Sequence, residues 1–188
     1  WRAGTEGEGL LPGTPRLLQR PVIPLVTALR SIGADIEPAP DGWHIAGKPL
    51  RAETLAVDCT LSSQFASALL LIGPKIGLRA LETVPKTPPS EPYIAMTRYV
   101  VGEVLAGRPL RREADWSTAA FWYAFLAADT SINTLTLKDL YLDTLQGDAV
   151  VAEWFRGFGI LSEQTTEGVT ICRDKTNCNP VENNTFHL

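Results

Sequence analysis

Apolar side chains recur at helical spacing along several stretches of the chain. In residues 21–32 they fall on one face, with Pro21 near the start and Gly33 just after the end, which is typical of helix boundaries. The same criteria predict helices over residues 62–74, 92–105, 117–130 and 148–158. Short apolar runs bounded by turn residues predict strands at residues 35–37, 43–45, 78–84 and 132–137. Alternating helices and strands predict an α/β fold.

Part of this pattern occurs twice. Residues 29–33 resemble residues 155–159, and residues 41–45 resemble residues 167–171 at the same offset without a gap. A helix followed by Gly and a strand is common in any α/β protein. The shared loop length and the shared acidic-Gly turn nevertheless favour a true repeat. A looser similarity relates two further predicted helices, each opened by Ser and followed by a strand, over residues 62–74 and 117–130.

A domain boundary is predicted near residue 110. Gly107-Arg108-Pro109 interrupts the helical pattern, and the residues that follow are polar. The charge balance changes there as well, from 11 Lys and Arg against 10 Asp and Glu up to residue 110 to 6 against 11 beyond it. We therefore expect one domain segment over residues 1–110 and another over residues 111–188.

Composition excludes several classes of protein. The 188 residues are 45% hydrophobic with a net charge of −4, which is typical of a globular protein and not of a nucleic-acid binder. No apolar run reaches the roughly 20 residues that span a bilayer. Cys59, Cys172 and Cys178 are odd in number and lack CxxC spacing, so a disulfide framework and a Cys-rich zinc site are not expected and a reducing cytoplasm is. The chain lacks an initiator Met, so we expect a piece of something longer.

The candidate chemistry lies at predicted helix starts. Ser62, Ser63 and Gln64 open an apolar helix, where hydroxyls beside free backbone N–H groups can hold a phosphate or simply cap the helix. Arg20, shortly before a helix, offers a planar cationic fork for phosphate or carboxylate, or is an ordinary surface residue. Arg16 lies in the same approach and has the same two readings.

Two further groups have the same character. Ser90 and Tyr93 begin another helix, as a cap with an aromatic anchor or as groups that face a ligand. The segments 115–117 and 146–148 each carry an Asp and are best explained as helix N-caps. If these helix starts converge, they form a cleft for a phosphorylated or carboxylated small molecule. No Walker, GxGxxG or zinc motif competes with this interpretation.

These motifs resemble, in order and approximate spacing, those of the 3-phosphoshikimate 1-carboxyvinyltransferase (EPSP synthase) family. The resemblance rests on the segments 13–21, 61–65, 90–94, 115–117 and 146–148 and covers residues 10–175. It implies repeated βαβαββ units of the enolpyruvyl transferase fold, an inside-out α/β barrel, here incomplete. It places two repeat units of the first domain in residues 1–110 and the first unit of the second domain in residues 111–188.

The resemblance also implies an activity. The family transfers the enolpyruvyl group of phosphoenolpyruvate to the 5-hydroxyl of shikimate 3-phosphate in the shikimate pathway, which leads to chorismate and the aromatic amino acids. It needs no redox cofactor and no metal, and the intact enzyme is expected to be a cytoplasmic monomer without nucleic-acid or membrane partners. Carried over by motif, the residues that contact shikimate 3-phosphate are Ser62, Ser63, Gln64, Ser90 and Tyr93, and those that contact phosphoenolpyruvate are Arg20 and Gln64.

The chain also departs from the family pattern. The N-terminal Lys-Ser and Gly-Thr-Ala-Met-Arg elements and the catalytic Asp are absent, and a hairpin is missing between Val101 and Glu113. We therefore expect an internal segment that is inactive alone and marginally stable or self-associating. The alternatives are a non-catalytic anion-binding module of the same fold and a related enolpyruvyl transferase that uses a nucleotide-sugar acceptor.

Overall fold

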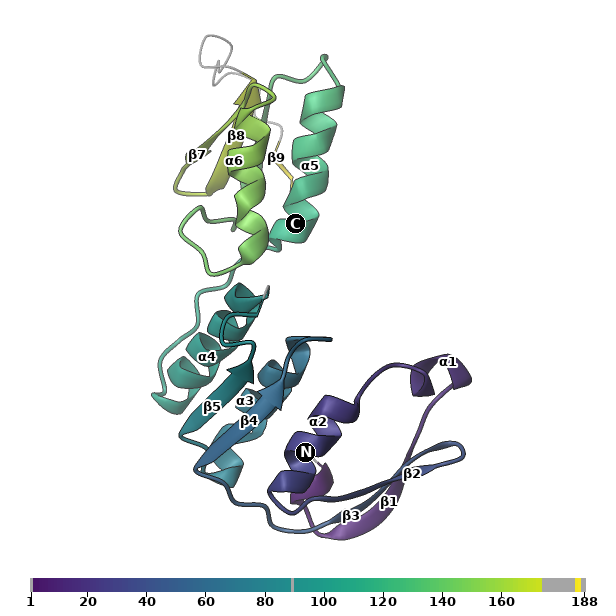
Figure 1. Ribbon diagram of the computed structural model, residues 1–188. Coiled ribbons are helices and arrows are strands. Elements are labelled where there is room, and N and C mark those ends of the chain that lie inside the picture. Colours follow the sequence, from purple (N-terminus) through teal and green to yellow (C-terminus); the bar gives the residue numbers. More distant parts are fainter. Residues whose placement is uncertain (1, 89, 174–184, 187–188) are drawn as a thin grey trace. The chain divides into compact units, whose positions relative to one another are not determined.

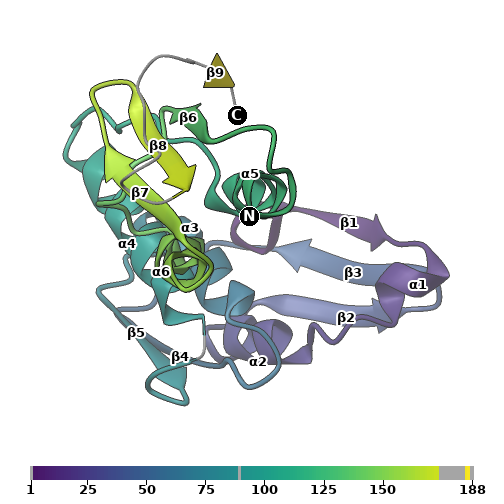
Figure 2. The ribbon, with the colours of Figure 1, turned by 90° about the horizontal axis from the view of Figure 1, so that it is seen from above.

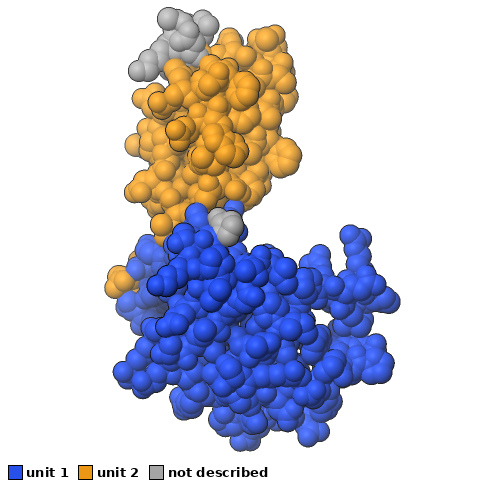
Figure 3. Space-filling view, viewed as in Figure 1, with its two compact units in different colours: residues 1–106 blue, residues 107–188 orange. Residues whose placement is uncertain are grey.

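The computed structural model describes residues 2–88, 90–173 and 185–186, and the chain divides into two compact units, Trp1–Ala106 and Gly107–Leu188 (Figure 3). The polar segment from residue 175 onward lies outside the described residues except for 185–186. Residues 107–115, which join the last helix of unit 1 to the first of unit 2, contain neither helix nor strand.

Unit 1 contains two small sheets and three long helices (Figure 1). Its elements are η1 (Arg2–Gly4), β1 (Gly7–Pro12), α1 (Pro15–Leu18), α2 (Ile23–Ser31), β2 (Asp35–Ala39), β3 (Gly42–Gly47), β4 (Thr54–Asp58), α3 (Gln64–Ile76), β5 (Ala80–Val84) and α4 (Glu91–Leu105). One sheet has the antiparallel order β1-β3-β2, seen side by side in Figure 2, and the other pairs β4 with β5 in parallel. Helices pack against the strands of each sheet, and the apolar faces of the helices are buried there.

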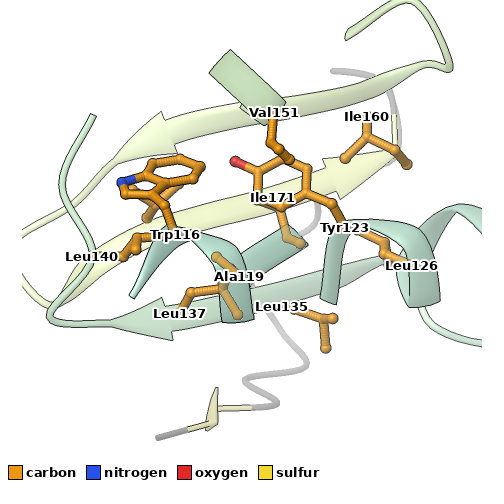
Figure 4. Close-up of a cluster of buried hydrophobic side chains, with 11 residues drawn as sticks. Trp116, Ala119, Tyr123, Leu126, Leu135, Leu137, Leu140, Val151, Ile160 and Ile171 are labelled. Atoms are coloured by element: carbon orange, nitrogen blue, oxygen red, sulfur yellow. The ribbon is translucent and has the colours of Figure 1, made fainter. Parts of the chain in front are cut away.

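Unit 2 is a four-stranded sheet covered by helices. Its elements are α5 (Trp116–Ala128), β6 (Thr134–Lys138), η2 (Gly147–Val150), α6 (Val151–Arg156), β7 (Ile160–Gln164), β8 (Gly168–Arg173) and β9 (Thr185–Phe186), with the strand order β7-β8-β6-β9. Figure 4 shows its core, in which Trp116 and Tyr123 from α5 pack against Leu137 and Ile171 from the sheet. These four side chains are wholly buried.

The two units contain the predicted repeat. Glu37 pairs with His44 in unit 1, and Glu163 pairs with Thr170 in unit 2, with each partner 126 positions further along the chain. A second strand pair repeats as well. The antiparallel pairing of β1 with β3 corresponds to the antiparallel pairing of β6 with β8, again 126 positions further along the chain. The arrangement β1-α2-β2-β3 therefore recurs as β6-α6-β7-β8.

Two glycines show why the repeat keeps its sequence signature. A Cβ atom on Gly42 would lie 2.2 Å from the carbonyl oxygen of Leu11, and one on Gly168 would lie 2.0 Å from that of Leu137. No side chain can be accommodated at such distances, so the acidic-Gly turn is a packing requirement in both units.

Several predicted boundaries were wrong. The region predicted as one helix over residues 148–158 is a 3₁₀ turn followed by a six-residue helix that ends at Arg156, because two glycines follow closely. The turn predicted over residues 38–42 is only two residues long, 40 and 41, because β2 continues to Ala39 and β3 begins at Gly42. Helix α3 continues past the predicted end at Pro74, which lies inside its last turn. Strands β1 and β4 were not predicted.

Candidate functional site

The starts of α3 and α4 lie at one edge of the parallel sheet. Strands β4 and β5 run in the same direction, and each is followed by a helix, so both helices begin at the carboxyl edge. The backbone N–H of Cys59, just after β4, donates to the carbonyl of Val84 at the end of β5 over 2.8 Å. The hydroxyl of Thr97 on α4 lies 3.1 Å from that of Ser67 on α3. These contacts hold the strand ends and the N-terminal halves of the two helices together.

The first turn of α3 carries two serines in different roles. The hydroxyl of Ser62 accepts a hydrogen bond from the Gln64 N–H over 3.2 Å. Ser63 occupies the N-cap position, but its hydroxyl makes no capping hydrogen bond. Its carbonyl accepts from the N–H groups of Ala66 and Ser67 over 3.1 and 3.4 Å. Because a helix start bears partial positive charge and exposed N–H groups, an uncapped hydroxyl there is suited to an anion.

The start of α4 has the same character. Ser90 is its N-cap residue and again makes no side-chain capping hydrogen bond, while its carbonyl accepts from the N–H of Tyr93 over 3.1 Å. Ser90 is half-buried, and Tyr93 is 40% exposed in the first turn. The structure therefore brings five predicted site residues to one sheet edge: Ser62, Ser63, Gln64, Ser90 and Tyr93.

Arg20 precedes a third helix start on the same side of unit 1. Strands β1 and β2 both pair antiparallel with β3, so they run in the same direction. Helix α2 connects them and is separated from β2 by three residues, so it runs back along the sheet and begins near the carboxyl end of β1. Leu29, near the end of α2, lines a small cavity with Ile72 and Ile76 near the end of α3, so these two helices end together. Figure 1 shows α2, α3 and α4 beginning on the same side of the unit. Arg20 itself is exposed, and its backbone N–H donates to Leu17 over 3.1 Å.

The carboxyl edge also holds two groups that the sequence did not single out. The hydroxyl and N–H of Thr60 donate to Asp58 over 2.7 and 2.8 Å and lower the pKa of that carboxyl, so Asp58 remains ionised at neutral pH. Burial raises the pKa of the Cys59 thiol, which therefore stays protonated and is not an activated nucleophile. The edge thus carries two acidic residues beside its hydroxyls, Asp58 at the end of β4 and Glu91 in the first turn of α4.

The corresponding helix start in unit 2 is closed by the protein itself. Asp115 caps α5 by accepting from the N–H groups of Ser117 and Thr118 over 3.3 and 2.9 Å, as predicted. The Thr118 hydroxyl, with these backbone bonds, lowers the pKa of Asp115. Asp148 accepts from the Ser117 hydroxyl. Carboxylates occupy the N–H groups that an anion would need.

The segment 146–148 was predicted to be a helix N-cap, and Gln146 does occupy the N-cap position of η2, but its side chain bonds elsewhere. Its side-chain oxygen accepts from the N–H of Trp116 over 2.9 Å, and its side-chain nitrogen donates to the Ala114 carbonyl over 2.8 Å and to Glu113 over 3.2 Å. It makes no capping bond to the 3₁₀ turn that follows it. Gln146 therefore caps α5 from a distant part of the chain. Burial raises the pKa of Glu113, but hydrogen bonds from Thr144 and the other neighbours outweigh it and leave that pKa lowered.

The described residues contain no group of three or more His, Cys, Asp or Glu that could hold a metal ion. None of the described helices is long and apolar enough to span a membrane. Against the cysteine interpretation, Cys172 is disulfide-bonded.

Known proteins resemble this chain along most of its length. The family model of EPSP synthase (3-phosphoshikimate 1-carboxyvinyltransferase) matches residues 2–106. The 3-phosphoshikimate 1-carboxyvinyltransferase of Bacteroides fragilis is 32% identical over 93% of the chain and 48% of its own length. Its namesakes from Methanoculleus marisnigri and Methanopyrus kandleri are 30% and 33% identical, over 87% and 88% of the chain and 44% and 43% of their own lengths. The chain spans about half the length of these relatives.

Repeated α/β units of this kind are those of the enolpyruvyl transferase fold, of which this chain holds an incomplete set. The chain belongs to the EPSP synthase family.

Proposed function

We propose that the protein transfers the enolpyruvyl group of phosphoenolpyruvate to the 5-hydroxyl of shikimate 3-phosphate. The products are 5-enolpyruvylshikimate 3-phosphate and phosphate, within the shikimate pathway of aromatic amino acid and chorismate biosynthesis. Family membership supports the proposal, as do the names of the relatives. The observation that carries it is the pair of helix starts at one sheet edge, where Ser63 and Ser90 occupy N-cap positions without using their hydroxyls as caps.

The roles of the individual residues follow from the charge of the substrates. Ser62, Ser63 and Ser90 contact shikimate 3-phosphate, because hydroxyls beside exposed helix N–H groups donate to a phosphate. Gln64 reaches both substrates with its amide. Tyr93 lines the shikimate side, where its partly exposed ring contacts the carbocycle.

Arg20 binds phosphoenolpyruvate through its planar guanidinium. In the reaction, the 5-hydroxyl adds to C2 of the enol while C3 gains a proton. Loss of phosphate and of a proton from C3 then restores the double bond. The residues of this chain bind and orient the substrates, and none of them is proposed as the catalytic acid or base. The 188-residue chain by itself is therefore inactive in this proposal. The intact protein acts as a cytoplasmic monomer and uses no redox cofactor.

The proposal is tested by phosphate release from the full-length protein that contains this chain. With both substrates present, Ser63→Ala and Arg20→Ala each lower kcat/KM by roughly 10- to 100-fold, the loss of one hydrogen bond to a charged group. The matched control is Ser131→Ala, which removes a serine hydroxyl from the loop before β6. Its kcat/KM stays within twofold of the parent.

The acceptor and the catalytic claim are tested separately. Turnover with UDP-N-acetylglucosamine in place of shikimate 3-phosphate would show that a nucleotide sugar is the acceptor. Calorimetric binding of shikimate 3-phosphate without turnover would identify a binding module instead of an enzyme. If the Ser63→Ala and Arg20→Ala variants keep the kcat/KM of the parent, these helix starts are not part of the substrate site.

A further inference from the structure

Helices α3 and α4 lie side by side, with their starts at the same edge of the parallel sheet (Figure 1). Their contact has an apolar part, in which Ala66 and Leu69 of α3 and Ile94 of α4 are wholly buried in one core cluster. Hydrophobic burial is not directional, so it tolerates small displacements of one helix along the other. A directional contact is needed to fix the two helix starts relative to each other.

A hydrogen bond between two hydroxyls supplies that contact. The Oγ1 atom of Thr97 lies 3.1 Å from the Oγ atom of Ser67 and 2.8 Å from the carbonyl oxygen of Tyr93, one turn earlier on α4. A threonine hydroxyl has a single hydrogen and a carbonyl can only accept, so Thr97 donates to Tyr93. The Ser67 hydroxyl therefore donates to Thr97. We call the contact between Ser67 and Thr97 the hydroxyl bridge.

The hydroxyl bridge continues through the backbone to both N-cap residues. The N–H of Ser67 donates to the carbonyl of Ser63 over 3.4 Å, and the N–H of Tyr93 donates to the carbonyl of Ser90 over 3.1 Å. A continuous series of hydrogen bonds thus leads from one N-cap residue to the other. A displacement of α3 along α4 that changes the spacing of the two helix starts must therefore stretch the bond between Ser67 and Thr97.

Helix formation does not explain why these two positions carry hydroxyls. Serine and threonine inside a helix stabilise it less than alanine does, because their hydroxyls compete for backbone groups. Ser67 and Thr97 are both half-buried and lie inside α3 and α4, beyond the N-cap residues. The contact that both hydroxyls share is the one between the helices, so the bridge is what these residue types provide.

We propose that Ser67 and Thr97 are positioning residues for shikimate 3-phosphate, because the hydroxyl bridge fixes the spacing of the starts of α3 and α4 before the substrate binds. The inference rests on the proposed function, since it concerns the same site. A ligand that contacts two helices binds more tightly when both are already in place, because binding then does not have to order them. Both residues act through Ser63 and Ser90, so neither is a catalytic residue.

Calorimetric titration of the full-length protein that contains this chain with shikimate 3-phosphate tests the proposal. Ser67→Ala and Thr97→Val each raise the Kd by about fivefold, the equivalent of one hydrogen bond between neutral groups. The double variant binds no more weakly than Thr97→Val, because both changes break the same bond. Thr97→Ser keeps the hydroxyl and stays within about twofold of the parent. The matched control is Ser31→Ala, which removes a hydroxyl that donates to the carbonyl of Ala28 within α2 over 2.8 Å and leaves the Kd unchanged.

The stoichiometry of binding separates positioning from stability. A variant that only folds less completely binds fewer molecules per chain with the Kd of the parent, and this result for Ser67→Ala and Thr97→Val would overturn the inference. So would a double variant whose loss of affinity is the product of the two single losses.

Ser63→Ala, titrated in parallel, distinguishes this inference from the proposed function. If Ser63→Ala weakens binding while Ser67→Ala and Thr97→Val bind like the parent, the positioning role alone is wrong. If Ser63→Ala also binds like the parent, the proposed site is wrong and the inference falls with it.

Discussion

Replacement of Gln146 by alanine is expected to destabilise unit 2 far more than an ordinary surface substitution. The side chain satisfies the N–H of Trp116, a residue that is wholly buried, and the carbonyl of Ala114 in the segment that enters the unit. It therefore ties the start of α5 to the loop before α6, two parts of the chain that are 30 residues apart. Alanine removes both hydrogen bonds and puts no polar group in their place.

The magnitude follows from these contacts. A hydrogen bond contributes about 1 kcal/mol net, and a donor left unsatisfied in a buried position costs about 1–3 kcal/mol. Because this hydrogen bond joins the wholly buried Trp116 to the half-buried Gln146, we expect the free energy of unfolding to fall by about 2–4 kcal/mol. With an m-value of about 1 kcal/mol per molar urea for a unit of this size, the urea concentration at the midpoint of unfolding falls by roughly 2–4 M.

The assay is urea denaturation followed by tryptophan fluorescence. Trp116 contributes to this signal, because its buried indole, whose N–H donates to the carbonyl of Tyr141 over 3.0 Å, becomes exposed to solvent on unfolding. Glu163→Ala, an exposed change in the same unit, is the control and shifts the free energy by less than about 0.5 kcal/mol. If Gln146→Ala behaves like this control, the two hydrogen bonds do not hold the unit together and the reasoning fails.

Three further changes test other parts of the account. Asp115→Ala lowers the free energy of unfolding by about 1–2 kcal/mol through loss of the helix cap. Because the pKa of Asp115 is lowered in the fold, the stabilisation by this carboxylate is present above about pH 4 and lost below it. Urea titrations of the parent and the variant at pH 7 and pH 3 measure this difference. Burial raises the pKa of Tyr123, whose hydroxyl lies 2.7 Å from that of Ser162, to about 12. The stabilisation by the neutral phenol is complete below about pH 10 and lost as the pH rises through 12. Ultraviolet absorbance should show one late-ionising tyrosine that is missing in Tyr123→Phe. Gly168→Ala places a Cβ 2.0 Å from the Leu137 carbonyl oxygen and should abolish the β-sheet circular dichroism of unit 2; a well-folded variant would contradict the repeat argument.

Local features of the fold were accessible from sequence. The end of α2 was predicted from Gly33, which has a φ of +93°, and the equivalent Gly159 has a φ of +75°. Both positions need a backbone conformation that glycine adopts without strain, so the residue type alone indicates the helix end. The repeat was visible for the same reason, because the glycines and the hairpin lengths are fixed by close backbone contacts.

Features that depend on distant partners were not accessible. Strand β1 is almost entirely exposed and contains two glycines, so its pattern carries no strand signal, and only its pairing with β3 defines it. Strand β4 did carry a signal, the alternation of buried Leu55 and Val57 with exposed neighbours, which was overlooked. The partner of Gln146 lies 30 residues earlier, and nothing near Gln146 in the sequence identifies it.

The predicted site shows the same division. The hydroxyls at the helix starts were found because capping residues have a local signature. Whether those starts meet depends on strand direction, which the sequence did not determine. The parallel pairing of β4 and β5 decides it, because it brings the first turns of α3 and α4 to one edge.

A nuclear magnetic resonance titration of the ¹⁵N-labelled chain with shikimate 3-phosphate tests the central claim most directly. We predict saturable shifts of the backbone amides of Ser63, Gln64 and Ser90, reduced in Ser63→Ala, and no shifts in the closed helix start at Ser117 and Thr118. Shifts confined to unit 2, or none at the starts of α3 and α4 at millimolar ligand, would contradict the account.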